Sequence, residues 1–361
     1  MKKIPKHKYN QAVPKVCPKC KSNQLILKGR RNNHFQILQI YQCQNPECKT
    51  FFSQNPAKNF SYPLRIQIKA ISFYNAGYTQ TKVSKLMSAR YKIRIPQRTI
   101  SFWKNYYQDL CTFSRFRKKA ILLYPPEQMI FSKKLYHQQV YNFQFHRAKL
   151  DILLNPASYG FEHRHDENHA KFSVLSSYLN KIPTKEFPHR IFSQDDKNRA
   201  SQIRPFFLKT TKLQKQNYAN LLAEIALKTT KTNTERHQII QDFMLHNDST
   251  TVATEVPVYF TREDADYFRK LGFRIAIPNS AFPITGHIDI IQIRNNLLHI
   301  LDYKPEAGKG FYKQQAPTQL TIYALALANR LRIPLKNIKC AWFDHKDYYE
   351  FFPLHAVYSK R

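Results

Sequence analysis

Residues 284–304, ITGHIDIIQIRNNLLHILDYK, constrain the fold more than any other stretch of this chain. Two apolar, alternating runs flank a tight polar turn at Asn295-Asn296, and this pattern predicts two buried strands paired as a hairpin. Asp289 lies near the middle of the first strand, and Asp302 and Lys304 lie at the end of the second. Buried strands have no structural need for charged groups at these positions, so the hairpin also predicts a functional site.

The charged groups of the hairpin predict a metal-dependent phosphodiesterase site. Asp302 and Lys304 share one side of their strand, and the turn allows Asp289 to approach Asp302. Two neighbouring carboxylates repel unless a cation lies between them, and their hard oxygens favour Mg²⁺ or Mn²⁺. Such a metal binds a phosphate and lowers the pKa of a bound water, while Lys304 orients or deprotonates that water. The alternative is a structural Asp–Lys pair at a strand end.

The segments around the hairpin predict an α/β layer with a mixed sheet. In chain order they are a helix at 235–246, a strand at 251–260, the hairpin strands at 284–294 and 297–304, a helix at 318–331 and a strand at 338–345.

Three motifs in this region resemble those of RecB-like PD-(D/E)XK nucleases. GHID at 286–289, ILDYK at 300–304 and QLTIY at 319–323 match the family pattern GxxD, DYK and QLxxY. The resemblance covers residues 235–345 and implies a restriction-endonuclease-like PD-(D/E)XK core. It also implies that Asp289 and Asp302 bind the catalytic metal and that Lys304 is the catalytic lysine. The cysteine cluster that holds an iron–sulfur centre in some RecB-like nucleases is absent, and so is any helicase motif.

The same resemblance implies further site residues. Gln319 and Tyr323 would brace the site and the DNA from the following helix. His237 and Glu255 would add metal ligands, with Glu224 as a competing candidate for the acid of the first helix. Gly286 would allow a close approach of the backbone.

Four of the six cysteines have the spacing of a structural zinc site, as CPKC at 17–20 and CQNPEC at 43–48. The thiolates of Cys17, Cys20, Cys43 and Cys48 can converge tetrahedrally on one Zn²⁺. Two disulfides are the alternative, but they are typical of secreted domains and nothing in the sequence indicates secretion.

Residues 17–52 resemble the zinc ribbons that open many prokaryotic transposases, which also have a basic hairpin between the cysteine pairs. We expect that hairpin to turn at residues 30–33, with Arg30 and Arg31 as candidate phosphate contacts. A closed shell of four thiolates leaves no open metal position, so the ribbon is not expected to be catalytic.

Residues 60–112 predict three short helices, at 64–75, from 80 after a Thr79 N-cap, and at 96–109 after Pro96. The pattern is similar to the helix-turn-helix domain that follows the ribbon in transposases and recombinases. The third helix would then enter the major groove. Its candidate DNA-binding residues are Gln97, Arg98, Thr99, Ser101 and Lys104. The alternative is a structural three-helix bundle.

The charge is concentrated towards the N-terminus. Residues 1–150 contain 29 lysine and arginine residues and three acidic ones, so they carry +26 of the net charge of +34. A polyanion bound mainly by this part is the natural partner, and we expect DNA. A merely soluble basic surface and an anionic membrane surface are the alternatives. No apolar run approaches the roughly 20 residues of a membrane helix, so no membrane partner is expected.

We therefore predict a multidomain protein with four regions, ordered as a zinc ribbon (1–55), a helix-turn-helix (60–112), a basic linker with a mainly helical middle (113–232) and a nuclease domain (233–361). The predicted activity is metal-dependent hydrolysis of DNA, as an endonuclease or exonuclease. The cell location would be cytoplasmic, at the nucleoid of a prokaryote or its mobile element, plasmid or virus. A cut through both strands would require two active sites, as in a homodimer. A regulator with an inactive nuclease fold and an RNA-processing nuclease are the rival functions.

Overall fold

The computed structural model describes residues 14–32, 37–53, 62–160, 167–193, 199–204, 210–214, 217–230 and 232–358. Two compact units divide the chain, Met1–Ala70 and Ile71–Arg361. The division lies inside helix α1 (Leu64–Asn75), so it does not coincide with the boundaries of the four predicted regions. Within the described residues, no helix combines the length and the apolar character that crossing a membrane requires.

The first unit contains a three-stranded antiparallel sheet, formed by β1 (Leu25–Asn32), β2 (Ile37–Cys43) and β3 (Phe51–Ser53). The predicted basic hairpin is therefore present, but its turn does not lie at 30–33. The register shifts between Leu27 and Arg30, and pairing then continues to Asn32. The connecting residues 33–36 lie outside the described residues.

Helices α2 (Gln80–Tyr91) and α3 (Gln97–Tyr106) follow α1 and confirm the predicted helix boundaries to within a few residues. The Thr79 hydroxyl accepts a hydrogen bond from the backbone N–H of Lys82, which satisfies one free donor of the first turn of α2. Pro96 is the N-cap of α3, where its missing N–H costs nothing. Ile100 and Trp103, three residues apart on one face of α3, are buried.

An eight-stranded sheet forms the centre of the second unit, with strand order β4-β5-β7-β8-β9-β10-β11-β6. Among the strands of the described residues, β9 and β10 pair in parallel and the other neighbours pair antiparallel, so the sheet is mixed, as predicted. The strands are β4 (Ile130–His137), β5 (Gln139–His146), β6 (Thr211–Lys212), β7 (Thr251–Phe260), β8 (Ile284–Arg294), β9 (Leu297–Tyr303), β10 (Ile338–Phe343) and β11 (Tyr348–Phe351).

The region at 113–232, predicted as mainly helical, supplies three of these strands. The β4–β5 hairpin extends the sheet beyond β7, and β6 adds its other edge. The hairpin was not predicted because Lys133 and Lys134, adjacent and exposed on the edge strand β4, interrupt the apolar pattern of a buried strand. The predicted boundary at 232 consequently separates strands that share one sheet.

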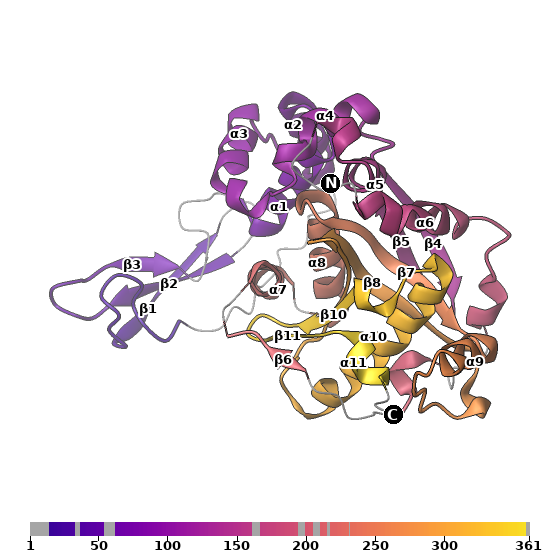
Figure 1. Cartoon of the computed structure of the whole chain (residues 1–361). Coiled ribbons are helices and arrows are strands. Elements are labelled where there is room, and N and C mark those ends of the chain that lie inside the picture. The colour runs from indigo at the N-terminus through magenta and orange to yellow at the C-terminus, as the bar shows by residue number, and fades with distance from the viewer. Residues whose placement is uncertain are drawn as a thin grey trace. The chain divides into compact units, whose positions relative to one another are not determined.

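Helices surround this sheet, and Figure 1 shows α10 running beside β7 and β8. Helix α10 begins eight residues before the predicted start at 318 and includes Pro317. The helices of this part are α4 (Ser114–Leu123), α5 (Arg147–Leu154), α6 (Glu167–Lys181), α7 (Tyr218–Thr229), α8 (Asn233–Asn247), α9 (Arg262–Lys270), α10 (Gly310–Leu331) and α11 (Pro353–Val357).

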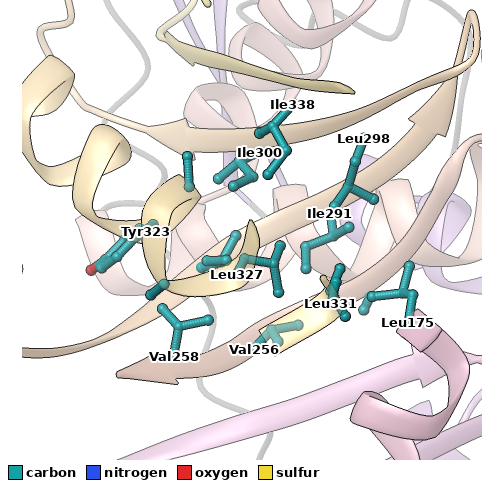
Figure 2. Close-up of a cluster of buried hydrophobic side chains, with 14 of the residues drawn as sticks. Leu175, Val256, Val258, Ile291, Leu298, Ile300, Tyr323, Leu327, Leu331 and Ile338 are labelled. Carbon is teal, nitrogen blue, oxygen red and sulfur yellow. The ribbon is translucent and has the colours of Figure 1, made fainter. Parts of the chain in front are cut away.

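The buried core lies between α10 and the central strands. Figure 2 shows Leu327 and Leu331 of α10 among aliphatic side chains of β7, β8 and β9, such as Val256, Ile291 and Ile300. Each of these five side chains is fully or almost fully excluded from solvent. Burying an aliphatic side chain of this size contributes about 1.5–3 kcal/mol, so the core holds α10 firmly against the sheet that carries the acidic residues.

A buried polar junction joins the helices at 71–106 to the sheet unit. Asn247, at the C-terminal end of α8, is fully buried. Its side-chain amide donates to Ser72 Oγ (3.0 Å), and its side-chain oxygen accepts from Asn75 Nδ2 (2.7 Å). The Arg117 guanidinium donates to the backbone carbonyl of Tyr74 and lies over its ring. These helices are therefore part of the same compact unit as the sheet.

Candidate functional site

Three acidic side chains lie in a row across adjacent strands. The pairs Thr254–Ile290 and Val256–Ile288 lie on either side of Glu255 and Asp289, so these two acids face each other across β7 and β8. The β8–β9 pairing extends to Ile290–Leu301, and Asp289 and Asp302 are the next residues on the two strands. Asp289 also accepts a hydrogen bond from the backbone N–H of Tyr303 (3.1 Å). Carboxylates directly opposite each other in a sheet destabilise it unless something compensates their charge.

Glu255 has an unusual backbone for a residue inside a strand. Its φ of 51° lies in the left-handed region, which costs a non-glycine residue about 1–2 kcal/mol. Glu255 and Asp289 are also less buried than nearly all other residues of β7 and β8. Gln241 of α8 donates to Glu255 Oε1 (2.7 Å) and fixes the carboxyl. Backbone strain of this kind is concentrated at functional sites in proteins.

Two basic side chains flank the acidic row. Lys304 Nζ lies 2.8 Å from Asp302 Oδ2, and His237 Nδ1 lies 3.3 Å from Asp289 Oδ2. Residues 302 and 304 share a side of the strand end, as the two-residue spacing predicted. His237 comes from α8, and its ring meets the Tyr303 ring edge-on, with 4.8 Å between centroids.

Burial and neighbouring charges shift the pKa values of these acids in different directions. Burial, followed by the charge of Asp289, raises the pKa of Glu255 to about 8. Burial likewise raises the pKa of Asp302, although Lys304 opposes the rise. Burial would also raise the pKa of Asp289, but His237, Asp302 and Lys304 together outweigh it, and the pKa falls below its ordinary value. Near neutral pH, the raised pKa values favour protonated forms of Glu255 and Asp302. A bound cation would displace these protons.

Helix α10 contributes Gln319 and Tyr323 next to the row. Gln319 Nε2 donates to the Tyr323 hydroxyl (2.9 Å). The Tyr323 ring lies directly on Gly286, where a Cβ atom would come within 2.3 Å of Tyr323 Cε1. The expected close approach at Gly286 is thus the approach of the tyrosine ring. Gln319 Oε1 is buried and meets no hydrogen-bond donor among the described residues.

The donor set at the row fits a divalent cation such as Mg²⁺ or Mn²⁺. It offers three facing carboxyl groups, the imidazole of His237 and the unsatisfied Gln319 Oε1. Oxygen donors of this kind suit hard cations. Among the described residues, the four cysteines bring their ligand atoms within 4.8 Å of one another, whereas the acids of the row do not form such a close group. Glu224, the competing acid, lies half-buried on α7, which packs against α8.

The four N-terminal cysteines converge. Their Sγ atoms all lie within 4.8 Å of one another, with 3.8 Å between Cys17 and Cys48 and 3.5 Å between Cys20 and Cys43. Four thiolates at about 2.3 Å from a tetrahedral Zn²⁺ would be about 3.8 Å apart. None of the four forms a disulfide. The cluster therefore fits a zinc ion, as the spacing predicted.

The candidate DNA contacts of α3 differ in exposure. Gln97 and Arg98 are exposed, but Thr99, Ser101 and Lys104 are half-buried. Lys104 Nζ instead lies over the ring of Tyr74, at 5.9 Å from its centroid. Arg30 and Arg31, the other candidate DNA contacts, are exposed on β1.

The exposed aromatic side chains of α3 escaped the sequence analysis. Phe102 and Tyr106 are 54% and 58% exposed. Phe102 lies two residues after Ile100 and one before Trp103, so helical periodicity turns it away from their buried face, and Tyr106, four residues further on, shares its side.

A cluster of aromatic and histidine side chains beside the acidic row was also not predicted from the sequence. The Tyr141 ring stacks on His287, with centroids 3.5 Å apart, and His287 lies two residues before Asp289 on β8. His137 Nδ1 lies 2.9 Å from His287 Nε2, and His137 Nε2 lies 2.8 Å from His189 Nδ1. Because β4 and β5 were not predicted, nothing in the sequence could place His137 and Tyr141 at this site.

Comparison with known protein families gives a match for one part of the chain. Residues 187–349 match the family model described as the PD-(D/E)XK nuclease superfamily. No curated protein and no solved structure matches the chain. The matched residues include all three facing acids and Lys304, and they begin upstream of the predicted start at 233. The chain thus carries a PD-(D/E)XK nuclease superfamily domain at residues 187–349.

Proposed function

We propose that this protein is a metal-dependent nuclease that hydrolyses DNA phosphodiester bonds at the Glu255–Asp289–Asp302 row. The observation that carries the proposal is that Asp289 and Asp302 follow directly on the last β8–β9 pair, where the backbone N–H of Tyr303 donates to Asp289, with Lys304 Nζ 2.8 Å from Asp302. A row of opposed carboxyls is unstable by itself, and a divalent cation removes the repulsion. The match to the nuclease superfamily supports the same reading.

Each residue of the row has a role in this proposal. Asp289 and Asp302 hold the metal, with Glu255 and His237 as further ligands. The bound metal would supply Lewis-acid chemistry, by binding phosphate oxygens and lowering the pKa of a water. Lys304 orients or deprotonates the attacking water and offsets the negative charge that develops on the phosphate. Gln319 and Tyr323 brace the site from α10, and Tyr323 is held by its contact with Gly286.

DNA is the proposed substrate because of the basic N-terminal part. The zinc ribbon would contact phosphates through Arg30 and Arg31, and α3 would enter the major groove. Phosphate contacts position a protein on the duplex, whereas base contacts specify the sequence. The ribbon would therefore contribute sequence-independent phosphate binding, and α3 would determine the preference for a DNA site. The zinc-ribbon and helix-turn-helix resemblance further suggests a mobile-element origin.

The test is cleavage of labelled linear and supercoiled DNA in Mg²⁺, Mn²⁺ or EDTA. Lys304→Ala should abolish cutting in either metal while DNA binding persists, because the substitution removes only the ammonium beside the metal. Lys181→Ala is the matched control, since Lys181 also pairs with an acid, Glu186 at 3.6 Å, but on the protein surface. This control should cut at the wild-type rate.

The other outcomes separate the rival functions. Binding without cutting in any metal would favour a regulator with an inactive nuclease fold. Faster cutting of RNA than of DNA of the same sequence would favour an RNA-processing nuclease. Cutting that persists in Lys304→Ala would refute the assignment of the site. Linear product from supercoiled DNA, compared at rising protein concentration, would show whether two copies act together.

A further inference from the structure

An aromatic ridge on α3 is the feature of the second unit that the proposed site leaves unused. Arg98, Phe102 and Tyr106 are four residues apart and line one side of the helix. All three are exposed, and the two rings stack with 6.1 Å between centroids. The opposite side of α3 is buried through Ile100 and Trp103.

The rings are held in place before any partner binds. Besides its contact with Phe102, the Tyr106 ring meets the Tyr107 ring edge-on, with 4.8 Å between centroids. Tyr107 is buried, so it forms a fixed support. Ordering a side chain in advance lowers the entropy lost on binding. The ridge is therefore a rigid apolar surface beside an exposed guanidinium.

The charge of the chain segment that contains the ridge points to a polyanion. No acidic residue occurs between Glu47 and Asp109, whereas basic residues are frequent there. A neutral apolar partner would not need this charge, and a cationic partner would be repelled. Duplex DNA presents phosphates at the edges of its major groove and an apolar group on its floor, the 5-methyl group of thymine.

We propose that α3 recognises thymine in duplex DNA, through contact of Phe102 and Tyr106 with thymine 5-methyl groups in the major groove. This inference rests on the proposed function, since it requires α3 to enter the groove. Arg98, one turn before Phe102, is placed to bind an adjacent guanine edge or phosphate. The ridge replaces Ser101 and Lys104 as the base-reading surface.

Uracil-containing DNA tests the proposal directly. A duplex amplified with dUTP has the sequence of its dTTP counterpart but lacks every 5-methyl group. Binding of both duplexes is measured in EDTA, so that cleavage does not interfere. Loss of one buried methyl contact corresponds to about a 4-fold weaker Kd. Wild type should therefore bind the uracil duplex about 4- to 16-fold more weakly.

Two variants test whether the ridge causes the preference for thymine over uracil. Phe102→Ser combined with Tyr106→Ser changes only exposed positions, and should bind both duplexes equally. Tyr267→Ser is the matched control, because Tyr267 is a half-exposed tyrosine of α9, and it should keep the wild-type preference for thymine.

Other results would overturn the proposal in distinct ways. Equal affinity of wild type for both duplexes would refute thymine reading but leave the nuclease assignment intact. Tighter binding of single strands without methyl dependence would mean that the rings stack on bases. A dimer that dissociates in the double variant, with DNA affinity unchanged, would mean that a second copy covers the ridge. Failure of wild type to bind any duplex would refute DNA targeting itself.

Discussion

Gly286→Ala should disrupt the candidate site through a single methyl group. The new Cβ would lie 2.3 Å from Tyr323 Cε1, 2.4 Å from its hydroxyl oxygen and 2.6 Å from Cζ. Carbon atoms in contact prefer about 3.5–4.0 Å, so the overlap exceeds what small movements absorb. Gly286 is not in the left-handed region, so alanine suits the backbone itself.

The magnitude follows from what Tyr323 must give up. Forcing a methyl group into a packed interior costs about 1–3 kcal/mol. Moving the ring also breaks the 2.9 Å hydrogen bond from Gln319, which contributes about 1 kcal/mol. The free energy of unfolding should therefore fall by about 2–4 kcal/mol. DNA cleavage should fall by about 100-fold, because a displacement near 1 Å at a reacting centre has that effect.

Urea denaturation of four proteins measures the coupling. Wild type, Gly286→Ala, Tyr323→Ala and the double variant form a cycle. Tyr323→Ala removes the clashing ring, so Gly286→Ala should cost little in that background, with a coupling of about 1–3 kcal/mol. Gly310→Ala is the control, because a Cβ there meets no atom within 4 Å. Additive effects, or a Gly286→Ala protein as stable and active as wild type, would refute the reasoning.

Three further predictions concern the metal sites and the buried junction. Purified protein should contain about one zinc per chain, and Cys17→Ser with Cys43→Ser should lose it; metal analysis that finds zinc unchanged would exclude the cysteine cluster as its site. In EDTA, wild type should lose more of its free energy of unfolding than Glu255→Gln with Asp302→Asn as pH rises from about 5 to about 8, because burial raises the folded pKa of Asp302 and Glu255 and the unfolded chain releases those protons first; the buried histidines, whose pKa values burial lowers, act in the opposite direction but equally in both proteins. Added Mg²⁺ should stabilise wild type more at about pH 8 than at about pH 6, and the opposite order would contradict the linkage. Asn247→Leu should lower the free energy of unfolding by about 2–5 kcal/mol, because it removes the hydrogen bonds to the buried Ser72 and Asn75. Asn180→Leu is the exposed control, whose amide bonds within its own helix turn, and it should cost less than about 0.5 kcal/mol. Equal losses in chemical denaturation would show that the junction is not a source of stability.

Local patterns in the sequence were sufficient for several elements. The α1, α2 and α3 helices follow from apolar periodicity and from the Thr79 cap, which act within one or two turns. The β8–β9 hairpin follows from its two apolar runs and its turn. These features depend on contacts between residues close in the chain, so their signals are legible in a single sequence.

Long-range pairing decided what local patterns could not. The β4–β5 hairpin joins β7 across more than 100 residues, and no local pattern indicates such a partner. Helix α10 extends back to Gly310 through Pro317 because the sheet buries its middle turns, although propensity favoured a later start. The mainly helical expectation for 113–232 missed the strands for the same reason.

The chemistry of the site divides in the same way. The amino-acid sequence by itself determined which groups are available: one aspartate in the middle of a strand, a second aspartate and a lysine at the end of the next, and four cysteines at metal-ligand spacing. Only the tertiary structure decided their geometry, because strand register is a property of paired segments. It placed Glu255 opposite Asp289 with a left-handed backbone, laid Tyr323 on Gly286 and turned Lys104 towards Tyr74. The sequence specifies the residue types, whereas the distances between them are set only when remote segments pack together.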